Sequence, residues 1–191
     1  MTQNTPSQSV YAPAPAEQEI KSHTLSILME NEPGALAKVA GFFTARGYNI
    51  DSLSVAETEH NEHLSRLTVV TKANDATLLL IKTQLSTLIQ VHSIRDLTVH
   101  GPFVAREVGL VKIRLDDLDA ETKSKAKALA AGYGARALNT PQSSTIYEIV
   151  GSAADVDAFI AAMRPFNPND ISRSGIAAIS NSDKAIGQDI A

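Results

Sequence analysis

The sequence contains no cysteine and no tryptophan, and aromatic residues make up only 5% of it. Without cysteine the chain forms no disulfide, offers no thiolate to a metal and has no cysteine nucleophile. Proteins without disulfides are typical of reducing compartments, so we expect a cytoplasmic location.

Long apolar runs and an excess of basic residues are also missing. No segment has the length and apolarity of a membrane-spanning helix, and residues 1–21 lack the basic start and apolar run of a secretory signal. The formal net charge is -4, whereas nucleic-acid binding relies on Lys and Arg to neutralise phosphates. We therefore expect no nucleic-acid partner and no membrane.

The length and composition of the chain suit an ordinary globular protein. With 191 residues, of which 43% are hydrophobic, the chain can bury a core and form one or two domains. Residues 1–21 are different, because Pro6, Pro13 and Pro15 lie among Gln, Ser, Thr and Ala. This composition predicts a disordered N-terminal tail.

The most informative stretch runs from His23 to Val55. Apolar and polar residues alternate over Thr24–Met29, which predicts a strand. Pro33 suits the first position of a helix, and the apolar stripe Leu36, Val39, Ala40 and Phe43 continues it. Gly47 fits a left-handed cap at the end of that helix, and Tyr48–Ile50 begins a second strand.

A helix N-terminus behind a Pro-Gly turn favours a negative ligand group. Its first N–H groups have no intrahelical acceptor, and it is the positive end of the helix dipole. Asn31 and Asn49 add polar side chains, so the stretch would suit a zwitterion such as a free amino acid. The alternative is that Pro33-Gly34 only makes a turn and Asn31 only caps it. The local pattern by itself favours this simpler interpretation.

The rest of the first half completes one unit. Ser65–Thr71 predicts a third strand, a stripe of Leu78, Ile81, Leu85 and Leu88 predicts a second helix, and Val91–Val99 predicts a fourth strand. His60 and His63 lie in the polar segment 58–63, where a solvated loop is favoured over a metal site because nothing fixes the geometry of the imidazoles. Residues 22–100 thus read as a β-α-β-β-α-β, ferredoxin-like domain.

The second half repeats this order. A strand over Val108–Leu115, a helix over Ala120–Ala131, two strands, a helix containing Phe159 and Met163, and a strand near Ile171 are predicted. We expect an α+β protein of two ferredoxin-like domains, with residues 101–105 as linker, residues 106–180 as the second domain and residues 181–191 as a polar tail. No arrangement of acid, base and nucleophile stands out, so catalysis is a weaker hypothesis than sensing.

Short sequence motifs in both halves of the chain resemble those of one family. The pattern N-x-x-G-A-L followed by R-G-Y-N-I, together with S-R-L-T, R-E and R-S-G further on, resembles the small, regulatory subunit of acetolactate synthase (acetohydroxyacid synthase), whose first domain is an ACT domain. These patterns stand here as Asn31–Leu36, Arg46–Ile50, Ser65–Thr68, Arg106-Glu107 and Arg173–Gly175, and the resemblance covers residues 22–184. Family members often have a basic residue after the apolar step that follows R-S-G; Asn181 stands near that place here.

The resemblance implies a non-catalytic subunit that dimerises through its ACT domain, activates a catalytic large subunit and confers feedback inhibition by valine in branched-chain amino-acid biosynthesis. The large subunit would hold thiamine diphosphate, Mg²⁺ and FAD, and this chain would hold no cofactor, no metal and no catalytic residue. The implied effector site consists of Asn31, Gly34, Ala35, Leu36, Asn49 and Ile50. Two alternatives stay open: an ACT-type sensor of another amino acid, and an assembly module of another metabolic enzyme.

Overall fold

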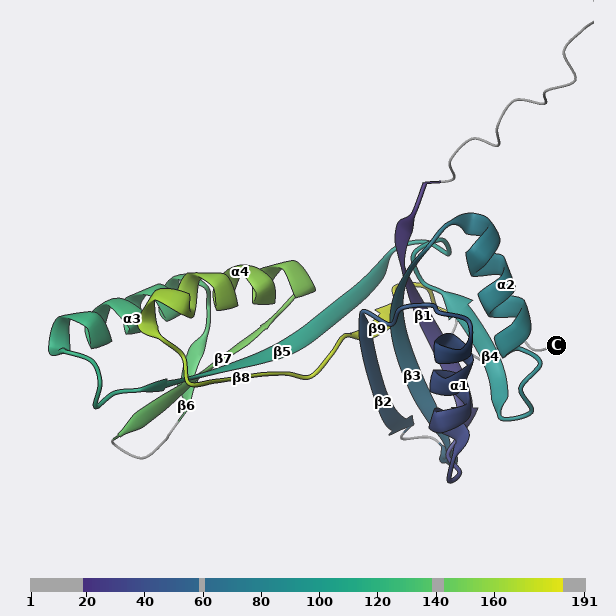
Figure 1. Cartoon of the computed structure of the whole chain (residues 1–191), viewed down its shortest axis with the longest axis horizontal. Helices are drawn as coiled ribbons and strands as arrows, with labels where there is room; N and C mark the ends of the chain where they lie inside the picture. The colour runs from purple at the N-terminus through teal and green to yellow at the C-terminus, as the bar shows by residue number, and fades with distance from the viewer. Residues whose placement is uncertain (1–18, 59–60, 139–142, 184–191) are drawn as a thin grey trace, which may run out of the picture.

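The computed structural model describes residues 19–58, 61–138 and 143–183. Within these ranges the chain forms two α+β units, each with an antiparallel sheet and two α-helices (Figure 1). The fold class predicted from the sequence, two ferredoxin-like units, is confirmed. The predicted tails lie mostly outside the described residues, although the first strand already begins at Lys21.

The first unit has the element order β-α-β-β-α-β. It consists of β1 (Lys21–Glu30), α1 (Ala35–Ala45), β2 (Ser52–Thr58), β3 (Asn61–Ala73), α2 (Asp75–Leu85) and β4 (Val91–Asp96). The strands lie in the order β2-β3-β1-β4, so β2 and β4 form the edges of the sheet. The Asn74 side chain accepts a hydrogen bond from the N–H of Thr77 and caps α2.

Alternation along β1 and β3 places one apolar face against the two helices. Leu25, Ile27 and Met29 of β1 are buried there together with Leu67 and Val69 of β3. The helix α1 contributes Ala35, Val39, Phe42 and Phe43 to this core. Of the predicted stripe, Val39 and Phe43 are buried in the core and Leu36 is 36% exposed.

The second unit follows the same order. It consists of β5 (Phe103–Arg114), α3 (Ala120–Gly132), β6 (Arg136–Leu138), β7 (Ser144–Gly151), α4 (Ala153–Met163), a short 3₁₀ turn (Arg164–Phe166), β8 (Asp170–Arg173) and β9 (Ala177–Ser180). The central strands lie in the order β6-β7-β5-β8. Phe159 and Met163 are fully buried, as predicted, and Ser152 and Asp155 form a capping box at α4.

The strand β5 belongs to both units. Its second half pairs with β7 and β8, whereas Phe103–Arg106 pair with Ser180–Ala177 of β9. The expectation that residues 101–105 are a linker was therefore wrong from Phe103 onward, because β9, which the sequence pattern did not predict, supplies backbone partners there. Figure 1 shows β5 running from the second unit to the first.

The segment between β8 and β9 fastens the second unit to β2. The Ile176 N–H donates to Oγ of Ser52 at 3.1 Å, and Oγ of Ser54 donates to the Ile176 carbonyl at 2.6 Å. Gly175 has φ +76°, and a Cβ there would lie 3.0 Å from the carbonyl oxygen of Leu53. Glycine is required at this position both by the left-handed backbone and by the close approach to β2.

Candidate functional site

A type II turn connects β1 to α1. The N–H of Ala35 donates to the carbonyl of Glu32 at 3.1 Å, and Gly34 has φ 88° and ψ -10°. These values place Pro33 and Gly34 at the two central positions of the turn, where proline and glycine are each favoured. Pro33 is thus a turn residue and not the first helical residue, which corrects the prediction, and α1 begins two residues later at Ala35.

The N-terminus of α1 has no side-chain cap, and its first turn contains no acidic residue. The Ala35 N–H donates to the Glu32 carbonyl within the turn. The next N–H groups, those of Leu36 and Ala37, have no intrahelical acceptor in a first turn. Their direction and the helix dipole favour a carboxylate.

Asn31 lies next to this helix end and is held by the neighbouring strands. Its N–H donates to the His63 carbonyl at 2.7 Å, and its Nδ2 donates to Oε1 of Glu57 at 2.6 Å. Glu57, near the end of β2, places a carboxylate close to the helix end where an ammonium group would pair with it. Sequence reasoning missed Glu57, because its proximity to Asn31 depends on how β2, β3 and β1 lie beside one another.

Asn49 and Ile50 follow the other end of α1. Gly47 has φ 68°, and the N–H groups of Gly47 and Tyr48 donate to the carbonyls of Thr44 and Phe43, so the predicted left-handed cap is confirmed. The predicted strand start at Tyr48 was wrong, because β2 begins only at Ser52. Ile50 packs partly buried against the core.

The Asn49 side chain is exposed, and its Nδ2 donates to Oδ1 of Asp51 at 2.6 Å. The carbonyl of Asn49 accepts a hydrogen bond from the Thr71 hydroxyl, also at 2.6 Å. These bonds hold the segment between α1 and β2 against β3, so Asn49 is a fixed surface group.

One chain therefore separates the predicted site residues into two groups. Asn31 and Gly34–Leu36 lie at the start of α1, whereas Asn49 and Ile50 follow its end. A helix of 11 residues is about 16 Å long at 1.5 Å per residue. A ligand the size of an amino acid does not reach both groups within one chain.

A buried polar pair was also missed by sequence reasoning. Nδ1 of His23 lies 3.1 Å from Oδ2 of Asp96, and the two side chains are 2% and 0% exposed. Oδ1 of Asp96 accepts a hydrogen bond from the Thr98 N–H. This pair joins β1 to the end of β4, and β4 stops at Asp96 rather than at Val99 as predicted, because the chain turns there to supply that N–H.

The described ranges contain neither a metal-binding cluster nor a membrane-spanning helix. No group of three or more His, Asp or Glu side chains is arranged there to hold a metal ion. His60, from the segment considered above for metal binding, lies outside the described residues. Among the described helices none is long and apolar enough to cross a membrane.

Comparisons with known proteins give the same family for both units. The family model of the AHAS small subunit-like ACT domain matches residues 25–93, and that of the small subunit of acetolactate synthase matches residues 106–182. The acetolactate synthase small subunit of Mycobacterium bovis is 35% identical over 167 residues, covering 87% of this chain and 96% of its own length. That of Mycolicibacterium smegmatis is 33% identical over 166 residues, covering 87% and 95%.

A solved structure agrees with these relatives. The acetolactate synthase small subunit from Thermotoga maritima has a TM-score of 0.76 and 32% sequence identity, covering 86% of this chain and 99% of its own. Matches to both units, in the same order and over nearly the full length of the relatives, show that this chain belongs to the family of acetolactate synthase small subunits and that its first unit is an ACT domain.

Proposed function

We propose that this chain is the non-catalytic regulatory subunit of an acetolactate synthase, that it activates the catalytic large subunit, and that it makes that enzyme sensitive to valine. The observation that carries the proposal is the uncapped start of α1 behind the left-handed Gly34, flanked by Asn31 and the exposed Leu36. In a member of this family, that arrangement suits the carboxylate of an amino acid.

The valine site is assembled from two chains. The start of α1 in one chain receives the carboxylate on backbone N–H groups, and the amide of Asn31 and the carboxylate of Glu57 orient the polar end of the ligand. Leu36 forms one apolar wall. Asn49 and Ile50 come from the neighbouring chain, because within one chain they follow the opposite end of the 11-residue α1.

A homodimer through the ACT domain provides this geometry. The strand β2, which directly follows Asn49 and Ile50, lies at the edge of its sheet, and an edge strand offers backbone groups to a second chain. Valine that bridges two chains binds one arrangement of the dimer more tightly than another, so it shifts the population toward that arrangement. Feedback inhibition is the response of the large subunit to this shift.

The chemistry belongs to the catalytic partner. The large subunit binds thiamine diphosphate, Mg²⁺ and FAD and condenses pyruvate with pyruvate or with 2-oxobutyrate. The role of this chain is to bind that subunit and to change its activity.

Titration of the catalytic subunit tests the proposed function. Acetolactate formation by the cognate large subunit is measured at increasing concentrations of this chain, with and without valine. We expect activity to rise to a plateau and valine to reverse most of the rise. Activation that valine leaves unchanged would contradict the sensing role, and a flat titration would contradict the regulatory role as a whole.

Two other functions belong to different classes. An ACT-type sensor of another amino acid would show calorimetric binding of that amino acid and not of valine. An assembly module would bind no amino acid at all. The proximity of Asn31 to Glu57 at the uncapped helix end favours a sensor over an assembly module, because a scaffold needs no polar groups around a helix N-terminus.

A further inference from the structure

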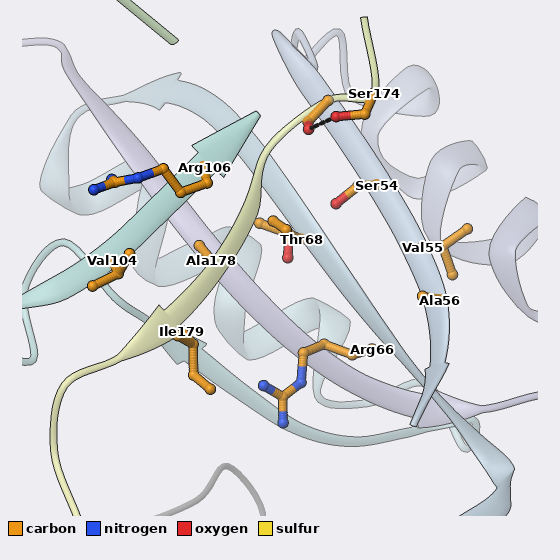
Figure 2. A pocket seen from close by; sticks show the side chains of 12 residues that line it. Ser54, Val55, Ala56, Arg66, Thr68, Val104, Arg106, Ser174, Ala178 and Ile179 are labelled. Carbon is orange, nitrogen blue, oxygen red and sulfur yellow. Dashed lines mark hydrogen bonds between the residues drawn. The ribbon is translucent and has the colours of Figure 1, made fainter. Parts of the chain in front are cut away.

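A second cavity lies between the helix-free face of the ACT sheet and the strands that lead to the second unit. Its volume is 470 Å³, within the range of small-molecule sites. Strands β2 and β3 form one side of it, and β5 and β9 form the other (Figure 2). None of the six residues of the implied effector site lines this cavity.

The lining combines a half-buried arginine with apolar walls. Arg66 of β3 reaches into the space, and its Nε is buried without a hydrogen-bond partner among the described residues (Figure 2). Val104, Ala178 and Ile179 supply apolar surface opposite β3. A buried guanidinium donor without an acceptor is costly, so a ligand that supplies the acceptor gains the corresponding free energy.

The charges around the cavity select the kind of ligand. Arg66 and Arg106 line the space and no Asp or Glu does. The guanidinium of Arg106 acts also on Asp155, where it contributes to lowering the pKa of that carboxyl after the larger effect of the Ser152 hydrogen bonds. Arg66 is the anchor that we infer for an anion, because its Nε is buried without an acceptor among the described residues.

An amino acid fits this cavity poorly, because its ammonium group would find no carboxylate to pair with beside Arg66. A phosphate also fits less well, because it has no apolar body to pack against Val104, Ala178 and Ile179. A single carboxylate on Arg66 with an apolar body against the walls satisfies both parts of the lining.

We propose that this cavity binds a small carboxylate with an apolar body, separately from the amino-acid site. Such a ligand would contact β2 and β3 of the ACT domain together with β5 and β9. It would thereby hold the two units in one relative position, which makes the cavity a second input through which a metabolite can act on the subunit. The inference does not depend on the valine site.

Octanoate is the probe for this proposal, used with the full-length chain in calorimetry and thermal denaturation. We expect one octanoate per chain and a melting temperature that rises with octanoate concentration. Octanamide, which keeps the apolar body and loses the charge, is expected to bind at least tenfold more weakly. Absence of octanoate binding, or equal binding of octanamide, would overturn the proposal.

Substitution of Arg66 tests whether this residue binds the carboxylate of octanoate. Arg66→Met keeps the length of the side chain and removes the charge, so octanoate binding is expected to fall at least tenfold while valine binding is unchanged. Arg114→Met, in which an exposed arginine near Asp117 is changed in the same way, is the matched control and should bind octanoate like the wild type.

A second substitution tests the location independently of charge. Ala56 pairs with Arg66 across β2 and β3 and is exposed, so Ala56→Phe blocks the opening without disturbing the core. It is expected to weaken octanoate binding at least tenfold. Wild-type octanoate affinity in both Arg66→Met and Ala56→Phe would place the ligand elsewhere and overturn the assignment.

Discussion

Gly34→Asp is expected to weaken valine binding by at least about 100-fold, because it places a carboxylate where the carboxylate of the ligand must lie. Gly34 is the N-cap of α1, so the added carboxylate lies beside the first N–H groups of the helix. Its negative charge repels the carboxylate of valine from these groups. Isothermal calorimetry with valine measures the loss.

Gly34→Asn separates charge from backbone strain. Both variants impose φ +88° on a residue with a side chain, and a Cβ at this position has no atom within 4 Å. Asparagine has the same size and tolerates a left-handed backbone, so it should lose much less affinity than aspartate. Unchanged valine binding in Gly34→Asp would show that the ligand carboxylate does not lie at this helix end.

Arg173→Met is expected to lower the free energy of unfolding by about 2–3 kcal/mol, because it leaves a buried carboxylate without its partner. The side chain of Glu107 is 4% exposed and accepts hydrogen bonds from Nε and Nη2 of Arg173 at 2.8 and 2.6 Å. Nη1 of Arg173 also donates to Asp157. The bonds to Glu107 are the main cause of the raised pKa of the Arg173 guanidinium. Because Arg173 is itself 38% exposed, water offsets part of the loss.

Urea denaturation of Arg173→Met, Glu107→Leu, the double variant that combines them and the control Arg114→Met checks this assignment. Arg114→Met, which removes an exposed ion pair, should change stability by less than about 0.5 kcal/mol. The double variant Glu107→Leu with Arg173→Met removes both charges and should be more stable than Arg173→Met alone. If the double variant instead loses as much free energy of unfolding as the two single variants together, an unpaired Glu107 carboxylate is not the cause.

Local pattern was enough to predict most of the fold. Alternation predicted β1 and β3, and helical spacing of apolar residues predicted α1, α2 and α4. These features depend on neighbours in the sequence, so they can be read without tertiary information. The turn at Pro33-Gly34 shows the limit, because proline is favoured both in a helix first turn and in a type II turn.

Contacts between distant segments could not be predicted in this way. The motifs that contain Glu107 and Arg173 carried the family resemblance separately, and only the fold shows that the two side chains form one ion pair. Strand β9 is four residues long and contains two alanines, so no pattern marked it as a strand. The cavity beside Arg66 depends on β9 and was missed for the same reason.

The candidate site depends on local sequence pattern and also on contacts between distant segments. The family resemblance predicted six residues for it, whereas the position of Glu57 beside Asn31 depends on how the strands of the sheet pair. Asn49 follows the end of α1 opposite to Gly34, which supports the proposal that the site is formed between two chains. In the proposed function, binding of valine and pairing of chains are one process.

Dimers of two different variants test that claim most directly. A chain with Gly34→Asp and a chain with Asn49→Ala are co-expressed with different tags and purified as mixed dimers, and valine binding is measured by calorimetry. Neither homodimer should bind valine with wild-type affinity. If the site is shared, the mixed dimer has one intact site, formed by the unchanged Gly34 of one chain and the unchanged Asn49 of the other, and binds one valine per dimer with wild-type affinity. Mixed dimers that bind no better than either homodimer would contradict a site formed between chains.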